Sequence, residues 1–132
     1  MHINLQPLPP ATKHTINADV LPLLKKGVTI INTSRGGLID TSALLEGIKS
    51  GIIGGVGMDV YENEGDYFFQ DWSAKNVDDP VLTQLLGNNK VVMTAHQAFF
   101  TREAIDKIVS TTIENIQEYS EGLRGKDLSN CV

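Results

Sequence analysis

Three short apolar runs, rich in β-branched residues, alternate along the chain with segments of helical pattern. The runs are residues 28–32, 55–60 and 90–95, and a fourth, residues 2–5, lies near the start. Each has the length and composition of a β-strand. Strands that alternate with helices form βαβ units, whose right-handed crossovers make neighbouring strands parallel. The sequence therefore predicts an α/β fold built on a parallel sheet.

Helix signals fill the intervals between these runs. Residues 18–26 are predicted to be helical, with Asn17 as the N-cap and with Pro22 weakening or kinking the second turn. Further helices are expected over residues 41–50 and 81–86. The longest predicted helix, residues 101–122, carries one apolar stripe: Ile105, Ile108, Val109, Ile113, Ile116 and Tyr119.

Two stretches beside the run 55–60 lack a helix signal. Residues 61–79 are polar and aromatic and are predicted to form a long loop, a feature that is uncommon in compact domains and often functional. Its aromatic residues 67–69 are expected to pack, with a lid or a partner contact as the alternative. The glycine cluster 54–57 precedes a predicted strand and lacks the G-x-G-x-x-G spacing, so it is predicted to be a turn and not a phosphate loop.

Charged and titratable side chains follow the predicted strands. Arg35 comes just after the run 28–32, Asp59 and Glu64 lie at and past the end of the next run, and His96 follows the last. In an open α/β sheet, ligands bind in the crevice beyond the carboxyl ends of the strands. Arginine binds carboxylates through its planar fork, and histidine exchanges protons near neutral pH. This arrangement predicts a site that binds a small anion and couples it to proton transfer.

Each of these residues also has a structural interpretation. A lone histidine at a strand end is more often structural than catalytic, and the structural interpretation of Arg35 is a surface arginine in a turn. Glu62, between Asp59 and Glu64, is expected to be a solvated residue of an acidic loop. The gathering of the four groups at equivalent strand ends favours the functional interpretation.

Composition excludes several other functions. The 132 residues suit one domain with a modest core, and the net charge of −5 with scattered lysines argues against a nucleic-acid surface. The three histidines are too scattered for a metal site. A single cysteine, Cys131, allows no internal disulfide, and neither a secretory signal nor an apolar run of bilayer length is present. A cytoplasmic protein without a membrane segment is expected.

Three motifs, in order and with suitable spacing, resemble those of the D-isomer-specific 2-hydroxyacid dehydrogenases. They are N-T-S-R-G-G-L-I-D at 32–40, G-M-D-V-Y-E-N-E at 57–64 and A-H-Q-A-F at 95–99. The segment G-D-Y-F-F at 65–69, and H-Q-A-F in place of the commoner P-H-I-G, are most similar to the fermentative D-lactate dehydrogenases. The resemblance covers nearly the whole chain from Ile3 onward, but only the C-terminal portion of the family's proteins.

The resemblance implies an architecture. Residues 1–98 would be the C-terminal half of the NAD-binding domain, which is half of a Rossmann-like doubly wound parallel sheet. Residues 99–132 would be a helix and tail that return to the substrate domain. In the family, an N-terminal substrate-domain segment and a first βαβ half with the glycine-rich phosphate loop precede this portion. The chain alone is therefore expected to be inactive and to need that part, or a partner in a homo-oligomer.

The resemblance also implies an activity, which is hydride transfer between NAD(H) and C2 of a small 2-keto or D-2-hydroxy acid such as pyruvate or D-lactate. Arg35 would bind the substrate carboxylate and help polarise the keto group. His96 would donate the proton to the developing alkoxide, and Glu64 would accept a hydrogen bond from His96 and keep it protonated. The residues implied to hold the cofactor are Pro7, Thr12, Thr33 and Asp59, with Asp59 at the nicotinamide carboxamide.

Two alternatives stay open at this point. One is a related D-2-hydroxyacid dehydrogenase that acts on glyoxylate, hydroxypyruvate or a bulkier 2-keto acid. The other is a non-catalytic interaction module, like the corepressors that share this fold.

Overall fold

The computed structural model describes residues 2–4, 7–72 and 76–130 of the chain. It divides into two compact units, residues 1–97 and residues 98–132. The first unit contains the sheet and every residue of the predicted site, and the second contains one long helix. The assignment of these parts to the NAD-binding and substrate domains of a dehydrogenase stays a prediction.

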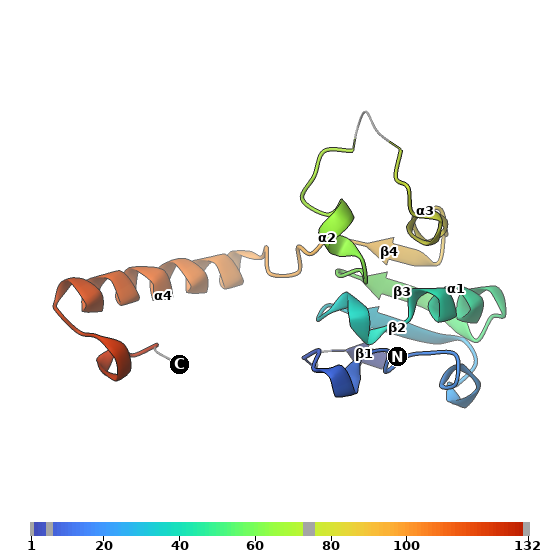
Figure 1. The fold of residues 1–132 in the computed structure, drawn as a ribbon, viewed down its shortest axis with the longest axis horizontal. Coiled ribbons are helices and arrows are strands. Elements are labelled where there is room, and N and C mark those ends of the chain that lie inside the picture. The colour runs from blue at the N-terminus through green and yellow to red at the C-terminus, as the bar shows by residue number, and fades with distance from the viewer. Residues whose placement is uncertain (1, 5–6, 73–75, 131–132) are drawn as a thin grey trace. The chain divides into compact units, whose positions relative to one another are not determined.

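The first unit is built on a four-stranded parallel sheet (Figure 1). Its strands are β1 (His2–Asn4), β2 (Val28–Asn32), β3 (Ile53–Met58) and β4 (Val91–Met93), and they lie in that order. Each neighbouring pair is parallel. The predicted α/β fold with a parallel sheet is therefore confirmed.

The strand ends differ in part from the prediction. β2 matches it, whereas β3 begins and ends two residues before the predicted run 55–60. Gly54 and Gly55 are strand residues, so the predicted turn at 54–57 is wrong. The reason is packing: a Cβ on Gly54 would lie 2.7 Å from the backbone oxygen of Gly27, and only glycine allows β3 to pass so close.

The last strand is shorter than predicted. β4 covers three residues of the predicted run 90–95, because Ala95 and His96 turn away with φ of 36° and 57°. β1 includes residues 2–4 of the predicted run 2–5, and Leu5 lies outside the described residues.

The helix predicted over residues 18–26 is wrong. Turns lead into a single 3₁₀ turn at Leu21–Leu23. Pro22 has no backbone N–H and disfavours helical geometry at the residue before it, so the segment does not continue as an α-helix. The predicted cap is present nevertheless, because Asn17 Oδ1 accepts hydrogen bonds from the N–H groups of Asp19 and Val20.

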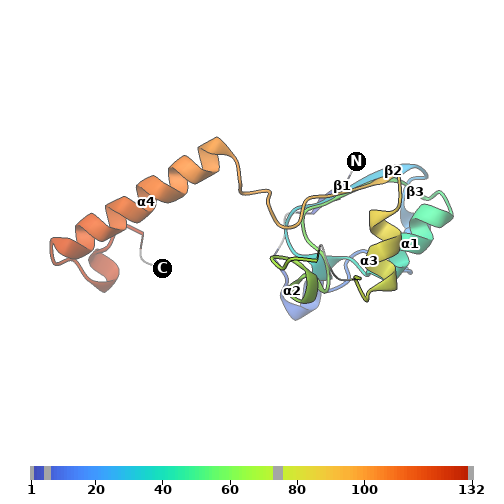
Figure 2. The same ribbon diagram turned by 90° about the horizontal axis from the view of Figure 1, so that it is seen from above.

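Two capped helices pack against each other and lie on the same face of the sheet (Figure 2). In α1 (Thr41–Lys49), the Asp40 carboxylate accepts from the N–H groups of the second and third residues. In α3 (Pro80–Leu86), Asp79 does the same, and Pro80 occupies the first turn, where its missing N–H costs nothing. Both predicted helices are confirmed. Their apolar side chains and those of the strands form the core, which includes Ile30, Leu44, Ile48, Ile53, Val56, Leu82 and Leu85.

The described part of the predicted loop 61–79 contains a short helix. This helix is α2 (Glu64–Tyr67). The Tyr61 hydroxyl donates a hydrogen bond of 2.7 Å to Asp79 Oδ2, which joins the first and last residues of the segment. Burial raises the pKa of the Tyr61 hydroxyl, and the hydrogen bond to Asp79 raises it further. For Asp79, burial alone would raise the pKa, but hydrogen bonds from the Leu82 N–H and the Tyr61 hydroxyl outweigh it and lower the pKa.

The second unit holds α4 (Arg102–Ser120), which confirms the predicted long helix with slightly shorter ends. Thr101 Oγ1 caps it by accepting from the Ala104 N–H, and Gly122 with φ of 96° follows its end. Most of the predicted apolar stripe is half or more exposed: Ile108, Val109, Ile113, Ile116 and Tyr119. No helix among residues 2–4, 7–72 and 76–130 is both long and apolar enough to cross a bilayer.

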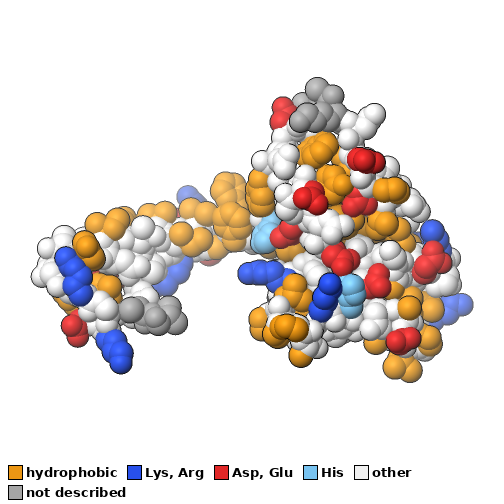
Figure 3. Space-filling model, viewed as in Figure 1, with side chains coloured by type: hydrophobic (Ala, Val, Ile, Leu, Met, Phe, Trp, Pro, Cys, Tyr) orange, Lys and Arg blue, Asp and Glu red, His pale blue; other side chains and the backbone are white. Residues whose placement is uncertain are grey.

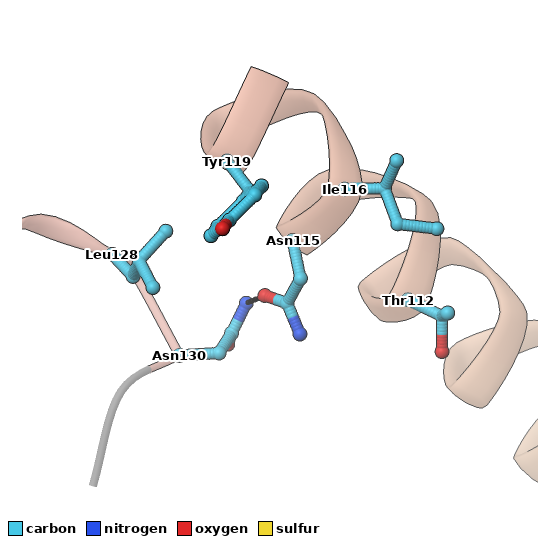
Figure 4. Close-up of a pocket in the computed structure, with 6 residues that line it drawn as sticks. All are labelled: Thr112, Asn115, Ile116, Tyr119, Leu128 and Asn130. Carbon is cyan, nitrogen blue, oxygen red and sulfur yellow. Dashed lines mark hydrogen bonds between the residues drawn. The ribbon is translucent and has the colours of Figure 1, made fainter. Parts of the chain in front are cut away.

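A shallow hollow of about 400 Å³ lies between α4 and the chain that follows it (Figure 4). Asn130 donates a hydrogen bond of 2.9 Å to Asn115 Oδ1 across this hollow, and Ile116, Tyr119 and Leu128 supply apolar walls. None of the predicted site residues lines it.

Candidate active site

The turn that carries Arg35 is held by a buried amide at the end of β2. Asn32 is fully buried; its Nδ2 donates to the Arg35 carbonyl at 2.9 Å, and its Oδ1 accepts from the Ser34 N–H at 3.2 Å. A buried amide that is satisfied in this way fixes the backbone of the turn. The Arg35 side chain itself is exposed, and its Nη1 donates to the Ser34 carbonyl at 2.8 Å.

The next residue, Gly36, lies against the backbone that follows β3. A Cβ on Gly36 would lie 2.0 Å from the Tyr61 carbonyl carbon and 2.4 Å from the Glu62 nitrogen. No side chain fits in that space. The Arg35 turn and the start of the segment 61–79 are therefore in direct backbone contact.

Asp59, just past β3, connects the strand ends on both sides of it. Its N–H donates to the Asn32 carbonyl at 2.9 Å, and its carbonyl accepts from the His96 N–H at 2.5 Å. Asp59 is only 3% exposed. Its carboxylate oxygen Oδ1 accepts hydrogen bonds from the Thr94 hydroxyl at 2.6 Å and from the Gln97 N–H at 2.7 Å. Asp59 thus fixes the turn that contains His96, a structural role that the sequence did not predict.

That turn is strained. Ala95 and His96 both adopt left-handed backbone conformations, each of which costs a non-glycine residue on the order of 1–3 kcal/mol. The hydrogen bonds to Asp59 hold the turn in this conformation. Strain of this kind accumulates at functional sites, where it sets the direction of a reactive side chain.

His96 and Glu64 form a half-buried pair. His96 Nδ1 lies 3.0 Å from Glu64 Oε1, with side-chain exposures of 33% and 24%. The other carboxylate oxygen of Glu64 accepts from the Tyr61 N–H at 3.0 Å. The exposed ring of Phe69 lies with its centroid 6.3 Å from that of His96. Within the described part of the chain, the hydrogen bond to Glu64 orients the imidazole through Nδ1.

The structure therefore brings most of the predicted catalytic residues together. Hydrogen bonds run from the Arg35 turn through Asn32 to Asp59, then to His96 and on to Glu64. Among the described residues, the Arg35 guanidinium forms neither a hydrogen bond nor an ion pair with His96 or Glu64. Figure 3 shows acidic, basic and histidine side chains gathered on this face of the first unit.

Of the other predicted cofactor residues, Pro7 and Thr33 are exposed and Thr12 is half-buried. Thr33 is exposed directly after β2, and Pro7 is exposed in the N-terminal loop. The Thr12 hydroxyl closes that loop by hydrogen bonds to the carbonyls of Pro7 at 2.9 Å and Pro9 at 3.1 Å. Their contact with a cofactor stays a prediction.

Glu62 is not the solvated acidic residue that was expected. Its side chain is 24% exposed; Oε1 lies 2.5 Å from His14 Nε2, and Oε2 accepts from the Thr41 hydroxyl at 2.7 Å. Burial alone would raise the pKa of Glu62, but the hydrogen bonds from Thr41 and His14 outweigh burial and lower it. The partners lie 21 and 48 residues away in sequence, so no local pattern signals them.

No group of three or more His, Cys, Asp or Glu side chains that could hold a metal ion occurs within the described ranges.

Comparison with known protein families gives a specific match. The family described as D-isomer specific 2-hydroxyacid dehydrogenase, NAD binding domain, matches residues 2–98. A Schizosaccharomyces pombe protein named 2-hydroxyacid dehydrogenase homolog 2 is 49% identical over 113 residues, which are 86% of this chain and 34% of the relative. The Escherichia coli D-lactate dehydrogenase is 45% identical over 116 residues, 88% of this chain and 35% of the enzyme. The chain thus spans about a third of the length of these relatives.

Comparison with solved structures leads to the same group of enzymes. A structure described as that of the pyruvate reductase of Chlamydomonas reinhardtii superposes with a TM-score of 0.85 at 42% identity, and covers 97% of this chain and 39% of its own. The D-lactate dehydrogenase of Lactobacillus jensenii, solved with NAD⁺, has a TM-score of 0.86 at 26% identity, with 98% and 38% covered. The fold is therefore the Rossmann-like fold of this family's NAD-binding domain. A match over the whole sheet unit, with relatives that share nearly half of the aligned residues, makes the chain a member of the D-isomer specific 2-hydroxyacid dehydrogenase family.

Proposed function

We propose that the chain provides the acid/base residues of a D-lactate dehydrogenase-like oxidoreductase that acts on pyruvate and D-lactate. One observation carries this proposal: His96 is paired with Glu64 at the carboxyl edge of a parallel sheet, in a strained turn fixed by Asp59. A histidine oriented through one ring nitrogen by a carboxylate presents the other nitrogen for proton transfer.

His96 is the proton donor in this proposal. With Nδ1 directed at Glu64, Nε2 gives its proton to the keto oxygen of pyruvate while C2 takes up a hydride, and the product is D-lactate. In the oxidation direction, Nε2 takes the hydroxyl proton back. NAD, when bound, supplies or accepts the hydride. Glu64 faces Nδ1 at 3.0 Å and so fixes the orientation of the ring.

Arg35 binds the substrate carboxylate. Its guanidinium is exposed at the end of β2, where a planar fork can pair with both oxygens of a carboxylate. The buried Asn32 amide fixes the backbone from which it projects. Pairing at this point directs the keto group of a small 2-keto acid toward the neighbouring strand ends, where His96 lies.

The residues at the strand ends also fit the nicotinamide end of NAD. Thr33 presents an exposed hydroxyl just past β2, and the loop of Pro7 and Thr12 is pre-shaped by its own hydrogen bonds. The buried Asp59 carboxylate lies at the same edge of the sheet. We assign these four residues to cofactor binding. The Lactobacillus jensenii relative, which was solved with NAD⁺, supports NAD as the cofactor.

The rest of the enzyme comes from outside these 132 residues. We propose that residues 1–98 are the C-terminal half of an NAD-binding domain and that residues 99–132 return to a substrate domain. Turnover then requires the N-terminal part of such an enzyme, or a partner copy. We expect the reaction to take place in the cytoplasm, and the single cysteine, which permits no internal disulfide, is consistent with that.

The test is NADH oxidation by pyruvate, followed by NADH absorbance. It uses the purified chain and a hybrid in which this chain replaces the matching C-terminal portion of the E. coli D-lactate dehydrogenase. The hybrid should turn over and the chain alone should not. His96→Gln in the hybrid should lower kcat by a factor of about 10²–10⁴.

A matched pair of carboxylates tests the role of Glu64. Glu64→Gln should lower activity, whereas Asp66→Asn, an exposed acidic change in the same short helix, should not. A hybrid that keeps its rate with His96→Gln would refute the assignment of the proton donor. Glyoxylate and hydroxypyruvate complete the substrate panel, and a clear preference for either would replace pyruvate in the proposal.

A further inference from the structure

Two histidine–glutamate pairs flank the start of the segment 61–79. Glu64 pairs with His96, as described above, and Glu62, two residues earlier, pairs with His14. The two pairs have the same side-chain exposures, 33% for the histidine and 24% for the glutamate. The first pair belongs to the proposed reaction, and the second has no role in it so far.

The Glu62 carboxylate uses both of its oxygens on the first half of the chain. Oε1 contacts His14 Nε2 at 2.5 Å, and Oε2 accepts from the Thr41 hydroxyl at 2.7 Å and from the Thr41 N–H at 3.4 Å. Thr41 is a buried residue at the start of α1. One side chain after β3 is therefore attached to two points that lie 27 residues apart in sequence.

His14 and Thr41 lie at the two ends of a backbone pairing that involves the segment after Arg35. The His14 N–H donates to the Gly37 carbonyl at 2.9 Å, the Ile16 N–H to the Leu38 carbonyl at 3.1 Å, and the Asp40 N–H to the Ile16 carbonyl at 2.9 Å. We call these three hydrogen bonds the seam. They align residues 14–16 with residues 37–40, and Glu62 holds both ends of this alignment through His14 and Thr41.

The same segment touches the Tyr61–Glu62 peptide directly. Gly36 leaves no room for a side chain there, so the backbone after Arg35 and the backbone before Glu64 are in contact. The Tyr61 N–H in turn holds Glu64. A displacement of Glu62 would therefore move the Arg35 turn relative to the Glu64–His96 pair.

From these contacts we propose that Glu62 is a positioning residue, which keeps the carboxylate-binding Arg35 in register with the Glu64–His96 proton-transfer pair. The kinetic part of this inference rests on the proposed function; the structural part does not. A carboxylate suits the task because it accepts at both oxygens. A carboxamide has one accepting oxygen and presents an NH₂ group where a second acceptor is needed.

The first experiment is hydrogen exchange on the 132-residue chain, comparing Glu62→Gln with Glu46→Gln. Glu46 is an exposed carboxylate on α1 that pairs with Lys49. Glu62→Gln should speed exchange of the three seam amides about tenfold, while the amide of Val56, which bonds to Lys90 between β3 and β4, keeps its rate. Seam exchange that is as slow in Glu62→Gln as in Glu46→Gln would overturn the proposal.

A second pair of variants isolates the Thr41 contact. Thr41→Val removes the hydroxyl that Glu62 accepts from, and Thr41→Ser keeps it. Exchange of the seam should be faster in the valine variant and restored to the wild-type rate in the serine variant. Equal seam exchange in the two variants would contradict the proposed attachment.

The kinetic experiment uses the hybrid enzyme and separates positioning from simple loss of folded protein. Glu62→Gln should raise KM for pyruvate about tenfold with kcat nearly unchanged, because binding to a displaced Arg35 is lost while His96 and Glu64 remain. A fall in kcat at unchanged KM would show a purely structural role and overturn the positioning claim. An inactive hybrid would refute the proposed function alone, since the exchange results decide the attachment by themselves.

Discussion

Replacing Gly36 with alanine should be strongly destabilising. The added Cβ would lie 2.0 Å from the Tyr61 carbonyl carbon, 2.1 Å from its oxygen and 2.4 Å from the Glu62 nitrogen, whereas ordinary contact begins at 3.4 Å. The two backbones must separate by about 3.4 − 2.0 = 1.4 Å, and neither can rotate away as a side chain would. Overpacking of this kind costs about 1–3 kcal/mol. Disturbing the Glu62 hydrogen bonds adds about 1 kcal/mol, so we expect a total of about 3 kcal/mol.

Urea unfolding monitored by tryptophan fluorescence measures this cost. Trp72 is the only tryptophan, and its Nε1 donates to the Tyr67 carbonyl at 2.8 Å, so it reports on the segment that Gly36 touches. The matched control is Gly65→Ala, where an added Cβ meets nothing within 4 Å and α2 gains a better helix former. If Gly36→Ala unfolds within about 0.5 kcal/mol of wild type, as exposed substitutions do, the backbone contact is not present in solution.

Three further predictions concern the contacts around the site and the cap of α4. The pKa of Glu62 lies below its ordinary value of 4.5, so the stability that its carboxylate contributes is present above about pH 4.5 and is lost as the pH falls through the lower native value. In Glu62→Gln, the free energy of unfolding in urea should therefore depend less on pH between about pH 6 and pH 3. The same pH dependence in the variant and the wild type would contradict this. Tyr61→Phe leaves the buried Asp79 without its hydroxyl donor and should cost about 1–3 kcal/mol in the same assay, whereas Tyr119→Phe, on an exposed ring, should cost nothing measurable. Thr101→Ala removes the cap of α4 and should destabilise that helix by about 1 kcal/mol, seen as faster amide exchange in its first turn, and Thr101→Ser should retain slow exchange.

The parallel sheet and the gathering of polar groups at its edge could be predicted because both depend on short-range patterns. The run 28–32 is apolar and β-branched, and it forms β2 with the predicted ends. Arg35, Asp59 and His96 follow three successive strands. Since those strands are parallel and adjacent, their carboxyl ends must share one edge.

The predictions that were wrong have two causes, one local residue and contacts between residues distant in sequence. The helical pattern of residues 18–26 was outweighed by the single missing donor of Pro22. The start of β3 depended on the distance between Gly54 and Gly27, which no local pattern records. Glu62 looked solvated because His14 and Thr41 are distant in sequence, and only the folded chain brings them to it.

The left-handed turn at Ala95 and His96 is the part of the site that sequence patterns could least predict, since positive φ is uncommon for any residue other than glycine. Its cause lies in Asp59, a buried carboxylate at the end of the adjacent strand. A buried charge must find donors, and Asp59 finds them in the Thr94 hydroxyl and the Gln97 N–H, on either side of the strained pair. The same demand for partners explains Asn32, whose buried amide closes the Arg35 turn one strand away. Buried polar residues at the ends of neighbouring strands thus determine the turns that follow, and through them the positions of Arg35 and His96.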